Sequence, residues 1–365
     1  MKRIALVILV TILCTQTAWA ARAKVKSMSK DPYASALVID ADTGKVLFAD
    51  QADAVVYPAS VLKLMNLLVI LKQLEQGKLK LDDMVPVTVE AAKTGGSQVY
   101  LDPKEQFPLE DMLYALAVQS ANDAAVALAI HVAGSKEGFI ALMNQQAVEL
   151  GMKSTHFHSV HGLPPAEGQV PDETTASDLA ILCRELAKRP EALKYTGTKE
   201  RGFRENKFMM HNHNHLIGTV DGCDGFKTGY FEAAGFSIAA TAKRGGVRVI
   251  AIVMGSKDRK VRDAKTAELL AKGFAMLPPK PGAQTAIAAK PGITPKKTDA
   301  SAPPDETQPA QSQEKEKPAS AADWKWTTFF LGLLSGMIIS GIMVFFFMRR
   351  RSQPTMKRIK SQGLE

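Results

Sequence analysis

The sequence predicts an α+β domain in which strands from both ends share one sheet and the residues between them form a helical layer. Residues 34–50 alternate apolar and polar side chains around Asp42-Thr43-Gly44, a pattern typical of a β-hairpin. Residues 109–150 repeat their apolar side chains at helical spacing. Residues 234–254 alternate again, around a turn at Arg244-Gly245-Gly246. Strands at both ends with helices between them indicate one shared sheet.

The same patterns give the order of the elements. The apolar run after Ser60 predicts a helix that Gly77 stops, and Thr175-Ala176-Ser177-Asp178 resembles a capping box that opens another helix. Lys227-Thr228-Gly229 looks like a turn ahead of a strand. The expected elements are a hairpin over 34–50, helices over about 60–76, 109–133 with a break at 119–123, 136–150, 175–189 and 262–275, and strands over 234–242 and 247–254.

The positive charge of the chain lies mainly at its two ends. Of the formal charge of +9, the residues after position 348 contribute +5 and the first three residues contribute +2, which leaves +2 for residues 4–348. That remainder provides no basic face of the kind that binds nucleic acid, so nucleic acid is not an expected partner. With 365 residues, the chain can bury one sizeable core or form two domains.

The N-terminus has the three parts of a secretory signal peptide. A positively charged start precedes an apolar stretch over 4–13, and Ala18-Trp19-Ala20 forms an A-x-A cleavage site. The large residue before Cys14 argues against a lipoprotein. We therefore expect a signal peptide over 1–20, an exported mature protein and a short leader over 21–33.

The C-terminal part predicts a membrane anchor. Residues 278–323 are rich in Pro, Ala, Lys and Glu and indicate a disordered tether. Residues 327–348 carry no charge and would form a helix of about 33 Å, the thickness of a bilayer core. Residues 349–365 begin with three arginines, which places this basic tail in the cytoplasm. The sequence thus predicts a single-pass inner-membrane protein whose folded domain, 34–277, lies outside the cytoplasm.

Ser60 and Lys63 form the first candidate for chemistry. Their i, i+3 spacing at a helix start puts both side chains on one face, so the amine can lie within hydrogen-bond reach of the hydroxyl. A lysine acts as a base only when neutral, which burial or a neighbouring cation favours. Alone, the pattern is more typical of a serine N-cap with an exposed lysine.

Two later motifs complete the set. Ser120-Ala121-Asn122 falls at a break between helical stretches, where a hydroxyl can relay a proton and an amide can orient a lysine or a substrate. Lys227-Thr228-Gly229 offers a cation and a hydroxyl to a carboxylate, and its glycine permits close backbone approach. The same tripeptide at Lys93-Thr94-Gly95 leads into no strand, and we interpret that copy as chance.

The three motifs occur in the order expected for active-site serine enzymes with S-x-x-K, S-x-N and K-T-G motifs. Over residues 34–277 the chain resembles the low-molecular-mass penicillin-binding proteins of the serine-type D-alanyl-D-alanine carboxypeptidase family. The segments that carry the resemblance are Pro58-Ala59-Ser60, Gln119-Ser120-Ala121-Asn122-Asp123-Ala124, Thr155-His156-Phe157, His161-Gly162-Leu163 and Asp224-Gly225-Phe226-Lys227-Thr228-Gly229.

The resemblance implies a β-lactamase/transpeptidase-like fold, with an antiparallel sheet flanked by helices. It implies peptidoglycan stem peptides as substrates, β-lactam antibiotics as inhibitors, and neither a metal nor an organic cofactor. Ser60 would form an acyl-enzyme with Lys63 as base. It implies that Ser120 and Asn122 complete a proton path and contact the substrate. Lys227 and Thr228, beside Gly229, would bind the terminal carboxylate. The N–H groups of Ser60 and Tyr230 would form the oxyanion hole.

Two departures from the family pattern stand out. Tyr230 follows the third motif where many relatives have His, and relatives place a carboxylate-binding Arg in the stretch that here is His211-Asn212-His213-Asn214-His215. These histidines alternate as on a strand, but without an evident acidic or Cys partner nearby we favour a polar or carboxylate-binding lip over a metal site.

Other functions remain open at this stage. A class A β-lactamase would need a positioned Glu, for which only Glu167 is near. A DD-endopeptidase or a transpeptidase would use the same residues, whereas a non-catalytic wall-binding module would not need them all. Cys183 and Cys223 could pair or stay as buried thiols.

Overall fold

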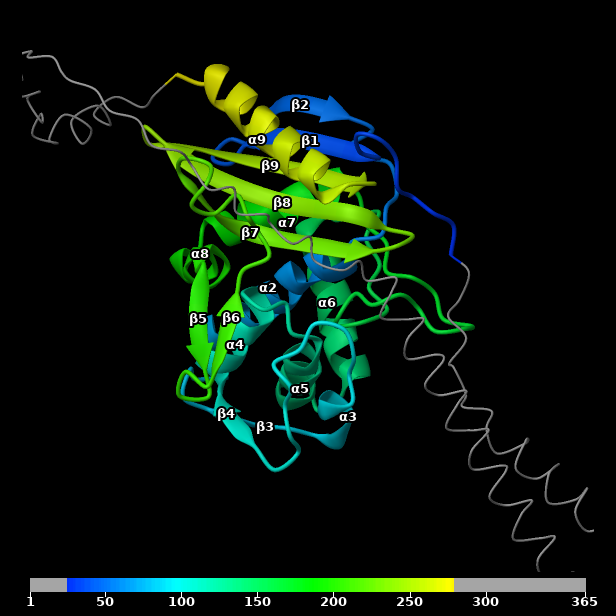
Figure 1. The fold of residues 1–365 in the computed structure, drawn as a ribbon, viewed down its shortest axis with the longest axis vertical. Coiled ribbons are helices and arrows are strands. Elements are labelled where there is room, and N and C mark those ends of the chain that lie inside the picture. Colours follow the sequence, from blue (N-terminus) through cyan, green and yellow to red (C-terminus); the bar gives the residue numbers. More distant parts are fainter. Residues whose placement is uncertain (1–24, 279–365) are drawn as a thin grey trace, which may run out of the picture. The chain divides into compact units, whose positions relative to one another are not determined.

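The computed structural model describes residues 25–278, and its centre is a five-stranded antiparallel sheet with strand order β2-β1-β9-β8-β7 (Figure 1). The strands of this sheet are β1 (Ser35–Asp40), β2 (Val46–Asp50), β7 (Cys223–Phe231), β8 (Gly235–Arg244) and β9 (Val247–Ser256). Because β1 pairs with β9, the first hairpin and the last strands form one sheet. The predicted shared sheet is confirmed.

The helices between β2 and β7 form a layer on one face of the sheet, and α9 covers the other face (Figure 1). The helical elements are the 3₁₀ turn η1 (Ala59–Leu62), α2 (Lys63–Glu75), α3 (Val89–Ala92), α4 (Leu109–Ala117), α5 (Asn122–Ala133), α6 (Lys136–Leu150), α7 (Ala176–Ala187), α8 (Pro190–Gly197) and α9 (Arg259–Ala275). The first nine residues of α2 are all buried, so the helix that begins with Lys63 runs through the middle of this layer.

Strand β9 shows why both faces of the sheet need cover. All ten of its residues are buried, and they divide alternately between two cores. Ile250, Ile252 and Met254 pack into the core that contains α2 and α7. Val249, Ala251 and Val253 pack with Leu269 and Leu270 of α9. A strand that is covered on both sides has a nearly continuous apolar run, which here spans residues 249–254.

The predicted hairpin, the break between α4 and α5, helix α6 and the capped helix α7 are confirmed. Thr175 caps α7 by accepting a hydrogen bond from the Asp178 N–H. The Asp178 carboxylate accepts from the Ser154 N–H and the Thr155 hydroxyl, so the second bond of a capping box is not formed. The expectation that Lys227-Thr228-Gly229 is a turn ahead of a strand was wrong, because these residues lie inside β7. The patterns also missed α3, α8 and two small hairpins, β3 (Met84–Pro86) with β4 (Gln106–Pro108) and β5 (Glu200–Phe203) with β6 (Phe208–His211).

The expected signal peptide over 1–20, the tether beyond residue 278, the membrane helix over 327–348 and the tail over 349–365 lie outside the described residues. Between residues 25 and 278, no single helix is long and apolar enough to cross a membrane. Helices α5 and α6 meet that criterion only as a pair, with an 84° bend between them.

Candidate active site

The turn η1 places Ser60 one turn ahead of Lys63, the first residue of α2. Lys63 Nζ lies 2.9 Å from Ser60 Oγ, 2.8 Å from Asn122 Oδ1 and 2.6 Å from the His161 carbonyl oxygen. The Lys63 side chain is therefore fixed by three oxygen atoms, one of which is the candidate nucleophile. The first and second motifs meet at this amine.

The amine of Lys63 is in an environment that favours its neutral form. Lys63 is 2 % exposed. Burial is the main cause that lowers its pKa well below the ordinary lysine value, and the charge of Lys227 is the second. A neutral amine at 2.9 Å from the Ser60 hydroxyl can accept its proton.

Two glycines allow the backbone to close around Ser60. A Cβ on Gly162 would lie 2.2 Å from the Ala59 carbonyl oxygen, and a Cβ on Gly229 would lie 2.9 Å from the Ser60 nitrogen. Ala59 itself has a φ of 47°, a conformation that non-glycine residues rarely adopt. The nucleophile is thus held by close backbone packing from the loop after α6 and from β7.

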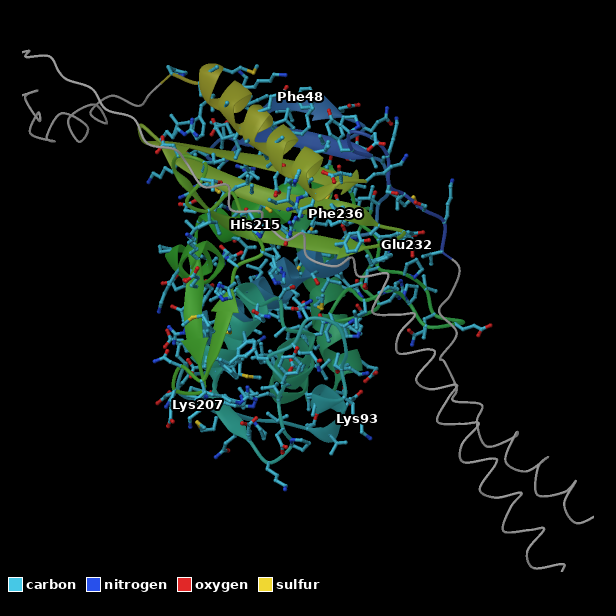
Figure 2. All side chains as sticks on the ribbon, in the orientation of Figure 1. Phe48, Lys93, Lys207, His215, Glu232 and Phe236 are labelled. Carbon is cyan, nitrogen blue, oxygen red and sulfur yellow. The ribbon has the colours of Figure 1, made fainter. Side chains whose placement is uncertain are left out.

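Asn122 connects Lys63 to the loop over residues 93–103. Its Oδ1 accepts from Lys63 Nζ, and its Nδ2 donates to the Gly95 carbonyl at 2.8 Å. The tripeptide Lys93-Thr94-Gly95, which we interpreted as chance, therefore orients Asn122 through its backbone. Its lysine lies among the helices, away from the sheet that carries Lys227 (Figure 2).

Ser120 lies at the same junction with a φ of 58° and borders the cleft beside Ser60. Its hydroxyl makes no hydrogen bond to another described residue, so it is available to a ligand. The neighbouring carboxylate of Asp123 is buried and accepts from the N–H groups of Val99, Leu101 and Ala124. Asp123 fixes the loop against α5, a role that the sequence did not reveal.

The third motif lies on β7, an edge strand of the sheet. Lys227 is 2 % exposed, and its pKa is lowered to about 7, first by burial and then by the charge of Arg262. Thr228, Gly229 and Tyr230 border the cleft.

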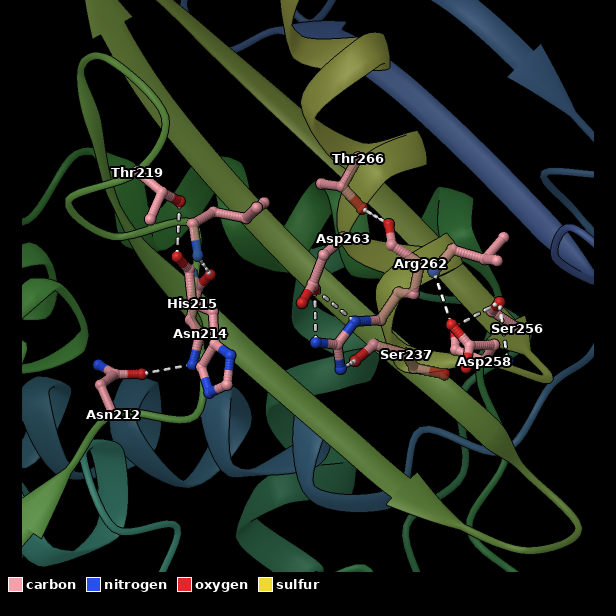
Figure 3. A network of polar contacts seen from close by, with 12 residues as sticks. Asn212, Asn214, His215, Thr219, Ser237, Ser256, Asp258, Arg262, Asp263 and Thr266 are labelled. Carbon is pink, nitrogen blue, oxygen red and sulfur yellow. Dashed lines mark hydrogen bonds and ion pairs between the residues drawn. The ribbon is translucent and has the colours of Figure 1, made fainter. Parts of the chain in front are cut away.

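The carboxylate-binding arginine expected before the third motif has a counterpart that the sequence did not reveal. Arg262 reaches the cleft from α9, with Asp263 Oδ1 2.9 Å from its Nε and the Ser237 carbonyl 3.4 Å from its NH1 (Figure 3). It is 2 % exposed, and its neighbour Lys227 is another cation. Arg262 thus supplies a positive charge to the cleft from α9.

Part of the histidine stretch borders the cleft. His213 and His215 line the cleft, but only His211 belongs to β6, so the alternation does not reflect a strand. Burial and then Lys227 lower the pKa of His213 to about 4, which leaves it neutral near pH 7. No group of three or more possible metal-binding residues occurs within residues 25–278.

The cleft has a volume of about 370 Å³, and none of the residues that line it is acidic. Glu167 is exposed and does not border it. The buried Asp172 accepts from the N–H groups of His158 and Ser159 and from the Ser159 hydroxyl. Neither Glu167 nor Asp172 therefore borders the cleft.

The sequence left open whether Cys183 and Cys223 form a disulfide or stay as buried thiols. Cys183 and Cys223 are both buried and free. Burial raises the pKa of the Cys223 thiol to about 11 and raises that of Cys183 further. Both are packing residues rather than a disulfide or a reactive pair.

Known proteins are similar to this chain in sequence and in fold. Residues 23–258 match the family model described as D-alanyl-D-alanine carboxypeptidase. The carboxypeptidase DacF of Bacillus subtilis is 40% identical over 281 residues, which cover 75% of this chain and 71% of that protein. Penicillin-binding protein 6B from Escherichia coli has a TM-score of 0.62 and 32% identity, covering 70% of this chain and 80% of that one.

A further structure carries a bound antibiotic. Penicillin-binding protein D2 from Listeria monocytogenes, in its ampicillin-bound form, has a TM-score of 0.60 and 29% identity, covering 69% of this chain and all of that one. The fold is accordingly that of a penicillin-binding protein or transpeptidase, with an antiparallel sheet and helices. The sequence and the fold lead to the same assignment: this chain belongs to the D-alanyl-D-alanine carboxypeptidase family.

Proposed function

We propose that this chain is a serine D-Ala-D-Ala carboxypeptidase that removes the terminal D-alanine from peptidoglycan stem peptides through an acyl-enzyme on Ser60. The observation that carries the assignment of roles is the distance of 2.9 Å between Ser60 Oγ and the buried Lys63 Nζ. The family and its carboxypeptidase members support the reaction class.

In the first step, the neutral amine of Lys63 takes the Ser60 proton while Oγ attacks the carbonyl carbon between the two D-alanines. Lys227, Thr228 and Arg262 bind the terminal carboxylate, and the N–H groups of Ser60 and Tyr230 stabilise the oxyanion. The C–N bond then breaks, and the proton passes to the departing amine of D-alanine, with Ser120 as the relay. An ester between Ser60 and the shortened peptide remains.

In the second step, water attacks the ester carbonyl and Lys63 again accepts a proton. The C–O bond to Ser60 breaks, and the serine regains its proton. A β-lactam enters at the first step, but its leaving group stays attached and cannot diffuse away. We therefore expect β-lactams to inhibit the enzyme, and the ampicillin-bound structure of the similar Listeria protein supports this.

Mass spectrometry of the full-length chain after incubation with penicillin, and separately with an acyl-D-Ala-D-Ala peptide, tests the proposal. We expect a persistent adduct on Ser60, release of free D-alanine, and neither with Ser60→Ala. Rapid loss of the penicillin adduct would instead indicate a β-lactamase, and no adduct would leave a wall-binding module. Cleavage of a cross-linked peptide dimer without D-alanine release would identify an endopeptidase.

We also propose that the enzyme is exported and held in the inner membrane by the apolar stretch over 327–348. The support is the length of that stretch and the basic residues that follow it, together with the A-x-A site at residues 18–20. Carbonate extraction should leave the protein in the membrane, and protease added to intact spheroplasts should degrade residues 34–277. Release by carbonate would contradict the anchor.

A further inference from the structure

The candidate active-site cleft extends past the catalytic groups to the first turn of α9. Beyond Thr228, its wall consists of Tyr230 and Phe236, whose rings stack with centroids 4.1 Å apart, and then of Arg259 and Arg262. His215 borders the same cleft, and Phe236 lies on β8 opposite Tyr230 of β7 (Figure 2).

The charge of this part of the cleft is positive. Arg259 and Arg262 line it, Lys227 lies behind it, and no lining residue is acidic. Two carboxylates on the first turn of α9 are already engaged: Asp263 binds Arg262, and Asp258 accepts from the Val261 N–H as the helix cap (Figure 3). The cleft can therefore accommodate a ligand with more than one negative charge.

The two arginines differ in their partners. The Arg262 guanidinium is buried and bound by Asp263 and the Ser237 carbonyl. Arg259 is exposed, and no described residue forms a hydrogen bond or an ion pair with its guanidinium. A cation at a helix N-terminus opposes the helix dipole, so an anion near Arg259 would relieve an unfavourable arrangement.

The positions of these groups indicate which part of a ligand would reach Arg259. The carboxylate of the residue that leaves after cleavage lies on Lys227, Thr228 and Arg262 in the proposed function. Arg259 neighbours Arg262 on α9, and its charge is one of the causes that lower the pKa of Arg262. A side chain of the leaving residue is the nearest substrate group that could extend toward Arg259.

We propose that Arg259, which borders the same cleft as His215, forms a second anion subsite that favours a leaving residue with a carboxylate in its side chain. The inference rests on the proposed function and extends its substrate class from D-alanine to acidic D-amino acids. Peptide cross-links through a dicarboxylic amino acid would present the same chemistry. The aromatic pair of Tyr230 and Phe236 would pack against the methylene groups of such a side chain.

The test compares kcat/KM of the full-length enzyme on acyl-D-Ala-D-Glu and acyl-D-Ala-D-Gln, which differ in one charge and little in shape. We expect the wild type to favour D-Glu over D-Gln by about five- to tenfold at low salt. Arg259→Gln should bring this ratio to about one. Lys260→Gln removes the same charge from the same helical turn outside the cleft and should keep the wild-type ratio.

A wild-type ratio of one, or a ratio that survives in Arg259→Gln, would overturn the subsite. His215→Gln should lower the ratio without abolishing it. The proposed function is tested separately, by penicillin acylation of Ser60 and release of D-alanine from acyl-D-Ala-D-Ala. If those reactions occur while the D-Glu to D-Gln ratio is one, only the subsite is wrong; if they fail, the proposed function itself is wrong.

Discussion

Lys63 and Lys227 are two buried lysines of one site, and the charge of Lys227 is the second cause, after burial, that lowers the pKa of Lys63. The charge of Arg262 likewise lowers the pKa of Lys227, and the charge of Arg259 lowers the pKa of Arg262. A row of basic side chains thus runs from the candidate base, Lys63, through Lys227 and Arg262 to Arg259. Repulsion favours the neutral amine at one end and anion binding along the rest.

Asn122→Asp should shift the pH dependence of acylation toward higher pH. The new carboxylate would replace the amide oxygen that is 2.8 Å from Lys63 Nζ. A neighbouring negative charge favours the protonated amine, so the pKa of Lys63 rises and less of the base is neutral at a given pH. We expect the acid limb of the rate of penicillin acylation against pH to move up by about one unit or more.

Gln145→Glu makes the same amide-to-acid change on α6, outside the cleft, and serves as the control. Its acid limb should coincide with that of the wild type. An unshifted limb in Asn122→Asp, in a protein that still acylates, would show that Lys63 is not the titrating base.

Lys227→Met should stabilise the protein at pH 6 and impair its reaction with penicillin. The folded-state pKa of about 7 lies below the unfolded value, so the folded state disfavours the charged form. That penalty is full below pH 7 and declines as the pH rises toward about 10. We expect a gain of about 1–3 kcal/mol in unfolding free energy at pH 6, a smaller gain at pH 9, and acylation slower by about 100-fold.

Urea titrations at the two pH values and stopped-flow acylation would measure both effects. Lys260→Met, which removes an exposed lysine from α9, should change neither quantity. A destabilised Lys227→Met protein at pH 6 would contradict the assigned burial penalty.

Gly162→Ala should destabilise the fold and slow acylation together. Its φ is 74°, and the new Cβ would lie 2.2 Å from the Ala59 carbonyl oxygen, so the peptide before Ser60 must move. Gly168→Ala is the matched control, because Gly168 has a φ of 80° and nothing within 4 Å of a Cβ. We expect the control to cost about 1–2 kcal/mol with normal acylation, and Gly162→Ala to cost more and to acylate at least about tenfold slower. Equal acylation rates in the two variants would refute the close packing around Ser60.

Cys183 and Cys223 should react with a disulfide reagent only after the protein opens. Both thiols are buried, and burial raises the pKa of Cys223 to about 11. Because the thiolate is the reacting form, labelling in native buffer should be at least about 100-fold slower than in guanidinium chloride. Fast labelling of the native protein would show that one of these sites is exposed.

The sequence predicted most of what depends on local pattern. The first hairpin, the long helices and the three motifs follow from periodicity, caps and turn residues, and these depend on neighbours in the chain. The element that it misplaced is β7, where Lys227-Thr228-Gly229 looked like a turn. Thr228 and Gly229 are tolerated in this strand because they border the cleft.

The missed roles share one property: each depends on a contact between parts of the chain that are distant in the sequence. Arg262 lies 35 positions after Lys227, and nothing around it in the sequence indicates that α9 points its first turn at the cleft. Asp123 appeared only as part of a motif, although it anchors the loop that carries Gly95. Such contacts result from how helices pack on the sheet, which no local pattern encodes.

The position of β7 at the edge of the sheet has a consequence for recognition. An edge strand has backbone N–H and C=O groups without a neighbouring strand and is normally prone to pair with another molecule. Here η1 packs against β7, and the cleft confines access to its edge. One extended peptide can align with such an edge as an added strand, through backbone hydrogen bonds. The open edge of β7 therefore offers a peptide backbone hydrogen-bonding groups right beside Ser60.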